Sequence, residues 1–236
     1  MFTLVLLFVA VSAACGQRIV GGNDADIKDY PYMAALEVDG RYVCAGVIVS
    51  PIKVVTVAGC SRLHGSADDL KVRAGSALRE NGGQLRSVSK IISHPLNIVM
   101  VFDVSVWILD EPLEINDQVR AIEIGSDEDV PIGAHANFTG WGVVRDDELA
   151  KQLQVVPMVK SSGCADFYGL IFFPFASVCY GGEIGRDACL KDLGGPVVFN
   201  GKLIGLYSYG GGLCVGHVPL MFTKLEAYLN FINNSN

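Results

Sequence analysis

Short runs of alternating or β-branched hydrophobic residues, separated by turn-forming glycine, proline and aspartate, recur along most of the chain. Residues 32–38 and 41–47 flank Asp39-Gly40, a dipeptide favoured in two-residue hairpin turns, so we expect a β-hairpin there. Pro51 interrupts the next run, residues 47–57, because proline has no N–H to donate to a neighbouring strand. The pattern therefore predicts an all-β protein.

Further runs of the same kind predict more strands, and one segment has a different period. Apolar residues recur at helical spacing over residues 225–232, so we expect an amphipathic C-terminal α-helix over residues 223–232. Proline, glycine and acidic residues make residues 111–131 the best candidate for a linker. The additional strand-like runs are residues 99–109, 134–144, 153–159, 196–199 and 203–209.

Composition and charge limit the possible partners. Half of the 236 residues are hydrophobic and 27 are glycine, which suits many short strands and tight turns. This length allows one all-β domain with a substantial core, or two small ones. The net charge is −7 and basic residues form no run, so we expect no nucleic acid and no membrane among the partners. Proteins and small neutral molecules remain open.

The first residues have the features of a targeting segment. Residues 4–14 are apolar or small, too few to cross a bilayer, and they end in Ser12-Ala13-Ala14, the small residues that signal peptidase requires. We expect a signal peptide over residues 1–16, cleaved after residue 14 or 16, and a secreted protein without a membrane anchor.

An oxidising destination predicts that the cysteines form disulfides. Cys15 lies in the signal peptide or directly after it, and the remaining six cysteines allow fifteen pairings, among which spacing does not choose. No Cys-x-x-Cys occurs and the four histidines are scattered, so we expect no metal site and no cofactor. The six cysteines are Cys44, Cys60, Cys164, Cys179, Cys189 and Cys214.

Several short motifs form one ordered series between residues 19 and 236. They are Ile19-Val20-Gly21-Gly22 after Arg18, Cys44-Ala45-Gly46, Ala58-Gly59-Cys60, Phe102-Asp103-Val104-Ser105-Val106, Gly140-Trp141-Gly142, Asp187-Ala188-Cys189-Leu190-Lys191-Asp192-Leu193-Gly194-Gly195-Pro196 and Ser208-Tyr209-Gly210. In this order they resemble the landmarks of the chymotrypsin-like serine proteases, from the activation site to the specificity pocket.

The resemblance implies a fold and a disulfide pattern. The fold is two perpendicular six-stranded β-barrels with a cleft between them and a C-terminal helix. The first barrel would cover about residues 30–120 and the second about residues 121–222, in a domain beginning at residue 19. The implied disulfides are Cys44–Cys60, Cys164–Cys179 and Cys189–Cys214, and we expect a monomer.

Only one member of the implied catalytic triad is present. Gly59 stands where the family has histidine, Leu193 stands where it has the nucleophilic serine, and Asp103 matches the aspartate. A leucine side chain cannot attack a carbonyl, and glycine has no side chain to carry the proton. Loss of such a triad lowers turnover by about 10⁶. We therefore predict a protease homologue without protease activity.

The neighbouring positions also depart from an active site. Lys191 replaces the family's glycine at the oxyanion hole, and we expect its Cβ to turn that peptide. Asp187 and Gly210 match the base and wall of a trypsin-type specificity pocket, but Leu220 replaces a wall glycine. We favour a pocket that Leu220 closes, and a surviving arginine-binding pocket is the alternative.

The remaining acidic residues have structural interpretations. Asp103 should accept hydrogen bonds from Ser208 and backbone N–H groups, or else be protonated, because an unpaired buried carboxylate is costly. By resemblance, cleavage of a short propeptide, residues 17–18, after Arg18 would let the new ammonium of Ile19 pair with Asp192. A chain that is never cleaved is the alternative.

Two sequons are candidates for N-glycosylation in a secreted chain. Asn137 begins Asn137-Phe138-Thr139 on a predicted strand, so we expect poor access there. Asn233 begins Asn233-Asn234-Ser235 near the terminus, where a glycan would matter little to function.

A narrower resemblance suggests a biological role. Asp24-Ala25-Asp26 and Tyr30-Pro31-Tyr32 resemble the trypsin-like proteases of mites, whose active members are allergens. With the triad lost, the chain is similar to the inactivated serine protease paralogues of the scabies mite, which implies binding of a host protein, a complement component, in immune evasion. The alternatives are a decoy that holds protease substrates or inhibitors in the old cleft, and a residual trypsin-like endopeptidase.

Overall fold

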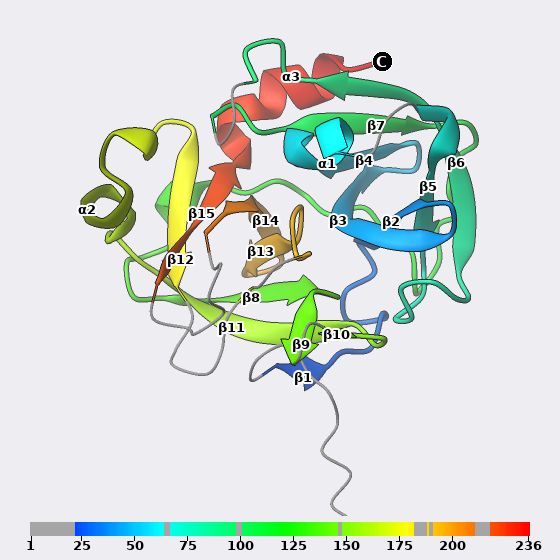
Figure 1. Cartoon of the computed structure of the whole chain (residues 1–236), viewed down its shortest axis with the longest axis horizontal. Helices are drawn as coiled ribbons and strands as arrows, with labels where there is room; N and C mark the ends of the chain where they lie inside the picture. Colours follow the sequence, from blue (N-terminus) through cyan, green and yellow to red (C-terminus); the bar gives the residue numbers. More distant parts are fainter. Residues whose placement is uncertain are drawn as a thin grey trace, which may run out of the picture.

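The computed structural model describes residues 22–63, 67–97, 101–145, 148–181, 188, 191–210 and 218–236. Antiparallel strands form two closed six-stranded β-barrels, and short helices lie outside them (Figure 1). This arrangement confirms the predicted fold class. The described residues do not include the predicted signal peptide, Arg18, Ile19 or Asp187. Cys189 and Cys214 of the third predicted disulfide also lie outside them.

The first barrel has the strand order β2-β3-β4-β7-β6-β5 and closes where β2 pairs with β5. The predicted hairpin is confirmed: Asp39 and Gly40 adopt φ angles of 50° and 73° between β2 and β3, as a tight hairpin turn requires. Pro51 lies in the turn that ends β3. The strands are β2 (Met33–Val38), β3 (Arg41–Ser50), β4 (Lys53–Thr56), β5 (Leu70–Ala74), β6 (Gln84–Ser93) and β7 (Ser105–Leu109).

The second barrel closes through the pairing of β8 with β11. The short strand β1 (Asn23–Asp24) is added to β11, and β9 (Val143–Arg145) pairs with β10 (Glu148–Leu149) in a small ribbon. The barrel strands are β8 (His135–Gly140), β11 (Gln154–Lys160), β12 (Ser177–Gly181), β13 (Pro196–Phe199), β14 (Lys202–Tyr209) and β15 (Pro219–Lys224).

The C-terminal helix begins later than the sequence pattern predicts. Thr223 and Lys224 belong to β15, because Thr223 pairs with Ser177 and Leu206 on the two neighbouring strands. A 3₁₀ turn, η4 (Leu225–Tyr228), follows, and only then the six-residue α3 (Leu229–Asn234). The other helical segments are α1 (Ala58–Leu63), η1 (Ala67–Asp69), η2 (Asp127–Asp129), α2 (Cys164–Tyr168) and η3 (Gly169–Ile171).

Two disulfides hold the helices on the barrels. Cys44–Cys60 joins β3 to α1, and Cys164–Cys179 joins α2 to β12. Both predicted pairings are confirmed. The loops that they close span 16 and 15 residues, and each such bridge contributes roughly 3 kcal/mol in the chain-entropy model. The disulfides therefore fix α1 to β3 of the first barrel and α2 to β12 of the second.

Candidate functional site

Asp103, two residues before β7, is the centre of the site. Its carboxylate accepts hydrogen bonds from the backbone N–H of Gly59 at 2.9 Å and from the hydroxyl of Ser208 at 2.6 Å. Asn97 lies at the hydrogen-bonding limit, with 3.5 Å between Nδ2 and Oδ1. The side chain is only 5% exposed. A buried carboxylate needs such partners, and Asp103 has them without an imidazole.

Gly59 lies in the first turn of α1 with its N–H directed at Asp103. An added Cβ would meet its nearest atoms at 3.7 to 3.9 Å, which is ordinary van der Waals contact. One of those atoms is Nη2 of Arg62, which lies 3.7 Å from Oδ1 of Asp103. Residues three apart share one face of a helix, so Arg62 brings its guanidinium to the side of α1 where a residue-59 side chain would lie.

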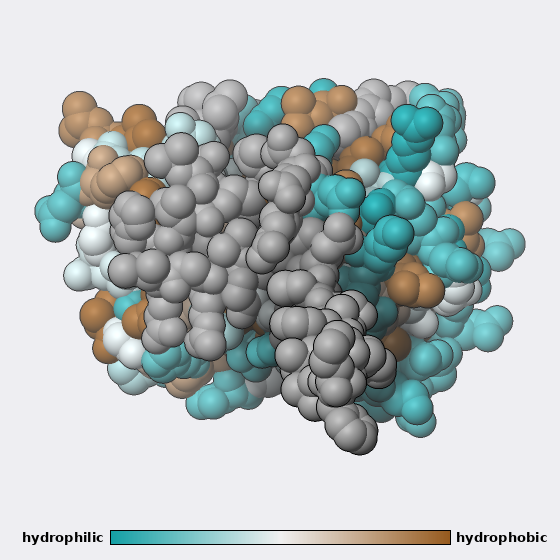
Figure 2. Space-filling view, turned by 60° about the horizontal axis from the view of Figure 1, so that its bottom comes forward, coloured by the Kyte–Doolittle hydropathy of each residue, from teal (hydrophilic) through white to brown (hydrophobic). Residues whose placement is uncertain are grey.

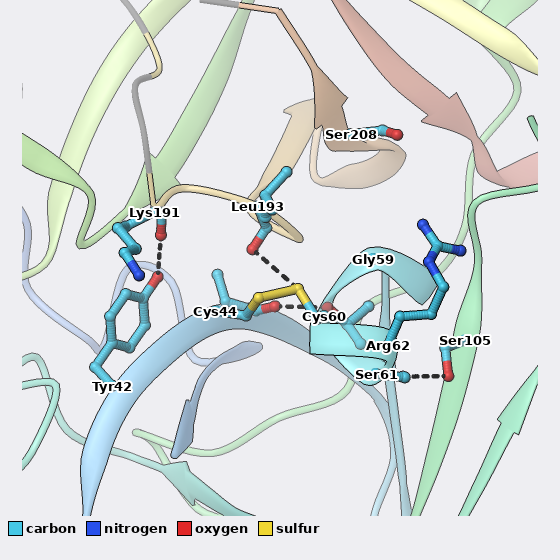
Figure 3. Close-up of a disulfide and its surroundings, with 12 residues drawn as sticks. Tyr42, Cys44, Gly59, Cys60, Ser61, Arg62, Ser105, Lys191, Leu193 and Ser208 are labelled. Carbon is cyan, nitrogen blue, oxygen red and sulfur yellow. Dashed lines mark hydrogen bonds between the residues drawn. A yellow bond between two sulfur atoms is a disulfide. The ribbon is translucent and has the colours of Figure 1, made fainter. Parts of the chain in front are cut away.

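Leu193 lies on the loop before β13, with its carbonyl directed toward Cys60 of α1 (Figure 3). Its carbonyl accepts a hydrogen bond from the N–H of Ala45 at 2.9 Å and lies 3.8 Å from Sγ of Cys60. Its half-buried side chain packs against the hydrophobic clusters of both barrels and points away from the disulfide. A hydrocarbon therefore fills this position.

Lys191 keeps a left-handed backbone, with φ at 71°. This is a conformation that favours glycine, and a lysine adopts it at a cost of about 1–2 kcal/mol. The Tyr42 hydroxyl supports it by donating to the Lys191 carbonyl at 3.0 Å. Burial, and then the negative charge of Asp192, hold the pKa of Tyr42 well above its usual value, so this hydroxyl remains a donor.

Asp192 is fully buried beneath the Gly140-Trp141-Gly142 segment. Its Oδ1 accepts a hydrogen bond from the Gly142 N–H at 2.7 Å. A Cβ at Gly140 or at Gly142 would overlap the carboxylate, which explains why this segment needs glycine on both sides of the tryptophan. The predicted partner of Asp192, Ile19, lies outside the described residues.

Leu220, on β15, is fully buried and lies beside Gly210. Its Cδ2 is 3.0 Å from the point where a Cβ of Gly210 would stand. The side chain of Leu220 therefore packs beside Gly210, the other residue that we assigned to the pocket wall.

The whole domain matches a known family. Residues 19–232 match the family model for trypsin. The chain belongs to the trypsin family. A vitellin-degrading protease of Bombyx mori is 31% identical over 226 residues, covering 92% of this chain and 85% of the relative. Hypodermin-A of Hypoderma lineatum is 36% identical over 200 residues, covering 82% and 77%. Neuropsin, a serine protease of mouse brain, has a TM-score of 0.79 at 25% identity, covering 90% of this chain and 97% of its own.

The trypsin-family scaffold brings together the three residues that we assigned to the triad positions. Gly59 and Asp103 are hydrogen-bonded, and Leu193 lies against the Cys44–Cys60 disulfide next to Gly59. Sequence reasoning missed Arg62. Its position three residues after Gly59 on a short helix could have indicated that it faces the same carboxylate.

His94 and His135 are the histidines among the described residues. His94 stacks on Phe102 with 5.0 Å between ring centroids, and its Nδ1 accepts the N–H of Leu96 at 3.3 Å. His135 is exposed on β8. Within the described ranges, no hydroxyl hydrogen-bonds to either imidazole, no group of His, Cys, Asp or Glu could hold a metal ion, and no helix could span a membrane.

The sequon at Asn137 is more accessible than we expected. Alternation along β8 places Asn137 on the exposed outer face and Phe138 in the barrel core. Asn233 is exposed on α3. Both asparagine side chains thus have solvent around them.

Proposed function

We propose that this member of the trypsin family is a catalytically inactive, secreted pseudoprotease that acts by binding a host protein, a complement component. The observation that supports inactivity is the surroundings of Asp103. Backbone, hydroxyl and guanidinium groups surround the carboxylate without an imidazole, and the nucleophile position carries the Leu193 hydrocarbon.

The missing groups are those that the chemistry needs. Acyl transfer by a serine protease requires a hydroxyl to attack and an imidazole to carry the proton. Gly59 and Leu193 provide neither. Arg62 cannot act as the base, because a guanidinium stays protonated in proteins. The position of Leu220 against Gly210 also argues against a decoy that holds an arginine or lysine side chain in the specificity pocket.

Secretion fits the cysteine chemistry. Two disulfides with separations of 16 and 15 residues are expected in an oxidising compartment rather than in the cytosol, and the apolar first residues supply a signal peptide. The choice of a complement component follows the resemblance to the scabies mite paralogues. Loops on a rigid β-scaffold are suited to such recognition.

The inactivity is tested with an arginyl ester and protein cleaved after Arg18. We expect turnover roughly 10⁶-fold below that of an active trypsin. Inhibitor-sensitive hydrolysis that persists through further purification would contradict the proposal.

The binding role is tested by capture from serum on the immobilised, folded protein. An active-site-blocked trypsin serves as the control, because it has the same scaffold with another surface. Specific recovery of a complement component is the expected result, and its absence would refute this role. A decoy would instead bind better after Leu220→Gly and would release its ligand to a peptide inhibitor, whereas we expect neither change to matter.

A further inference from the structure

The loop that follows α2 exposes an unusual amount of hydrophobic surface. Phe167, Leu170, Ile171 and Phe175 are 59%, 94%, 39% and 61% exposed. Tyr209, which is 42% exposed, joins them through Tyr168, with 5.8 Å between the two tyrosine ring centroids. We call Phe167, Leu170, Ile171, Phe175 and Tyr209 the α2 patch. Figure 2 shows hydrophobic atoms at its left edge, on the side where α2 lies in Figure 1.

The loop is held in place rather than left loose. The Cys164–Cys179 disulfide fixes its start, and the Tyr168 hydroxyl donates to the carbonyl of Pro219 at 2.6 Å. At the other end, the N–H groups of Ala176 and Ser177 both donate to the Phe173 carbonyl, at 2.9 and 2.8 Å. Because the apolar side chains are already ordered, a partner would bind them at little further cost in conformational entropy.

Aromatic contacts fix the exposed rings themselves. The Phe175 ring lies 5.8 Å from that of Phe173 and 6.1 Å from that of Phe102, which precedes Asp103. The Phe167 ring lies 4.9 Å from that of Tyr168. Through Phe102, the patch is therefore packed onto the same scaffold as the candidate site.

The area of the α2 patch matches that of a protein interface. A fully exposed side chain of this size presents about 200 Å², so the exposed fractions correspond to roughly 600 Å². One side of a standard protein–protein interface buries about 800 Å², of which somewhat more than half is apolar. A monomer rarely leaves a larger apolar patch open, and such patches are often functional.

Charge identifies the kind of partner. Asp166 is the only charged residue in residues 161–181, and the chain carries a net charge of −7. An anionic membrane surface and a second copy of this chain would both be repelled at long range, whereas a basic protein would be attracted.

We infer that the α2 patch is the docking surface for a protein partner whose contact area is apolar at its centre and basic around it. The inference rests on the proposed binding function and specifies the surface that performs it. The partner would cover Leu170 at the centre of its contact area, because this side chain is the most exposed of the five.

The test compares a patch variant with a matched surface variant. Phe167→Ser/Leu170→Ser removes two exposed hydrophobic residues of the patch, and Ile115→Ser/Leu85→Ser removes two from the first barrel, where they are 50% and 38% exposed. Both should fold, which unchanged melting temperatures would verify. Each protein is immobilised and exposed to serum, and the recovered complement component is quantified.

We expect the patch variant to recover at least about tenfold less of the complement component than the wild type. The matched variant should recover as much as the wild type. Recovery should also fall at high salt, because the basic surroundings steer association. Equal recovery by both variants would overturn the inference and leave the proposed function standing. No recovery by the wild type would overturn both.

Two further measurements test whether a second copy of the chain or a membrane covers the patch instead. Sedimentation of the wild type would show a concentration-dependent dimer, lost in the patch variant, if a second copy covered the patch. Co-sedimentation with phosphatidylcholine vesicles, again lost in the patch variant, would indicate insertion into a membrane. Either result would overturn the inference, and we expect neither.

Discussion

Replacing Asp103 with asparagine tests whether this carboxylate now has a structural role. In an active triad the aspartate orients the histidine. Here the carboxylate accepts the Gly59 N–H and the Ser208 hydroxyl in an almost fully buried position. Asp103→Asn preserves the shape of the side chain but removes its charge, and it places an NH₂ group where an acceptor is needed.

The expected loss follows from these contacts. A hydrogen bond to a charged group contributes about 1.5–3 kcal/mol, and asparagine can keep one of the two strong ones. We expect Asp103→Asn to lower the free energy of unfolding by about 2 kcal/mol, which for a domain of this size lowers the melting temperature by about 4–8 °C. Arg62→Gln should cost less than about 1 kcal/mol, because the guanidinium is 41% exposed and 3.7 Å from the carboxylate.

Urea denaturation followed by tryptophan fluorescence measures both changes. The matched control is Asp110→Asn, because the Asp110 carboxylate is exposed and accepts the N–H of the next residue. It should change the free energy of unfolding by less than about 0.5 kcal/mol. If Asp103→Asn were as mild as this control, the carboxylate would not be a structural acceptor and our account of the site would be wrong.

Two further predictions concern stability. Lys160→Met should lower the free energy of unfolding, measured by urea denaturation, by about 3–5 kcal/mol. The reason is that Nζ of Lys160 donates to the carbonyls of Asp127 and Val130 and lies 2.8 Å from the Asp127 carboxylate. The control Lys202→Met removes an exposed ion pair and should lower it by less than about 1 kcal/mol. Burial lowers the pKa of His94 below 6.5, so the folded state binds fewer protons than the unfolded state, and the free energy of unfolding should fall as the pH drops below 6.5. If His94→Asn left the dependence of this free energy on pH unchanged, the prediction would be wrong.

The fold could be predicted because its signals are local and repeated. The Asp39-Gly40 turn predicted the first hairpin, and the break at Pro51 predicted the end of β3. The strand β6 was not predicted, because its side chains are mostly exposed or half-buried and its hydrophobic alternation is therefore weak. Within the described part of the run predicted at residues 99–109, the strand begins at Ser105, since Phe102 adopts a φ of 52°, which no strand allows.

The site was only partly predictable, because its key contacts are long-range. Motif order placed Gly59, Asp103 and Leu193, but no local pattern indicates that a tyrosine 149 residues away donates to the carbonyl of Lys191. The α2 patch was not predicted, since a run of hydrophobic residues does not show whether a loop buries or exposes them.

The loop before β13 is held by contacts that need no catalytic group. A left-handed lysine persists only where its surroundings impose that conformation. Here Tyr42 and Ala45 of the first barrel hold the carbonyls of Lys191 and Leu193, and Asp192 is anchored at Gly142. None of these contacts involves a nucleophile or a base. Because this frame does not depend on a nucleophile or a base, it is compatible with the pseudoprotease that we propose, in which a surface loop on a rigid two-barrel support binds the partner.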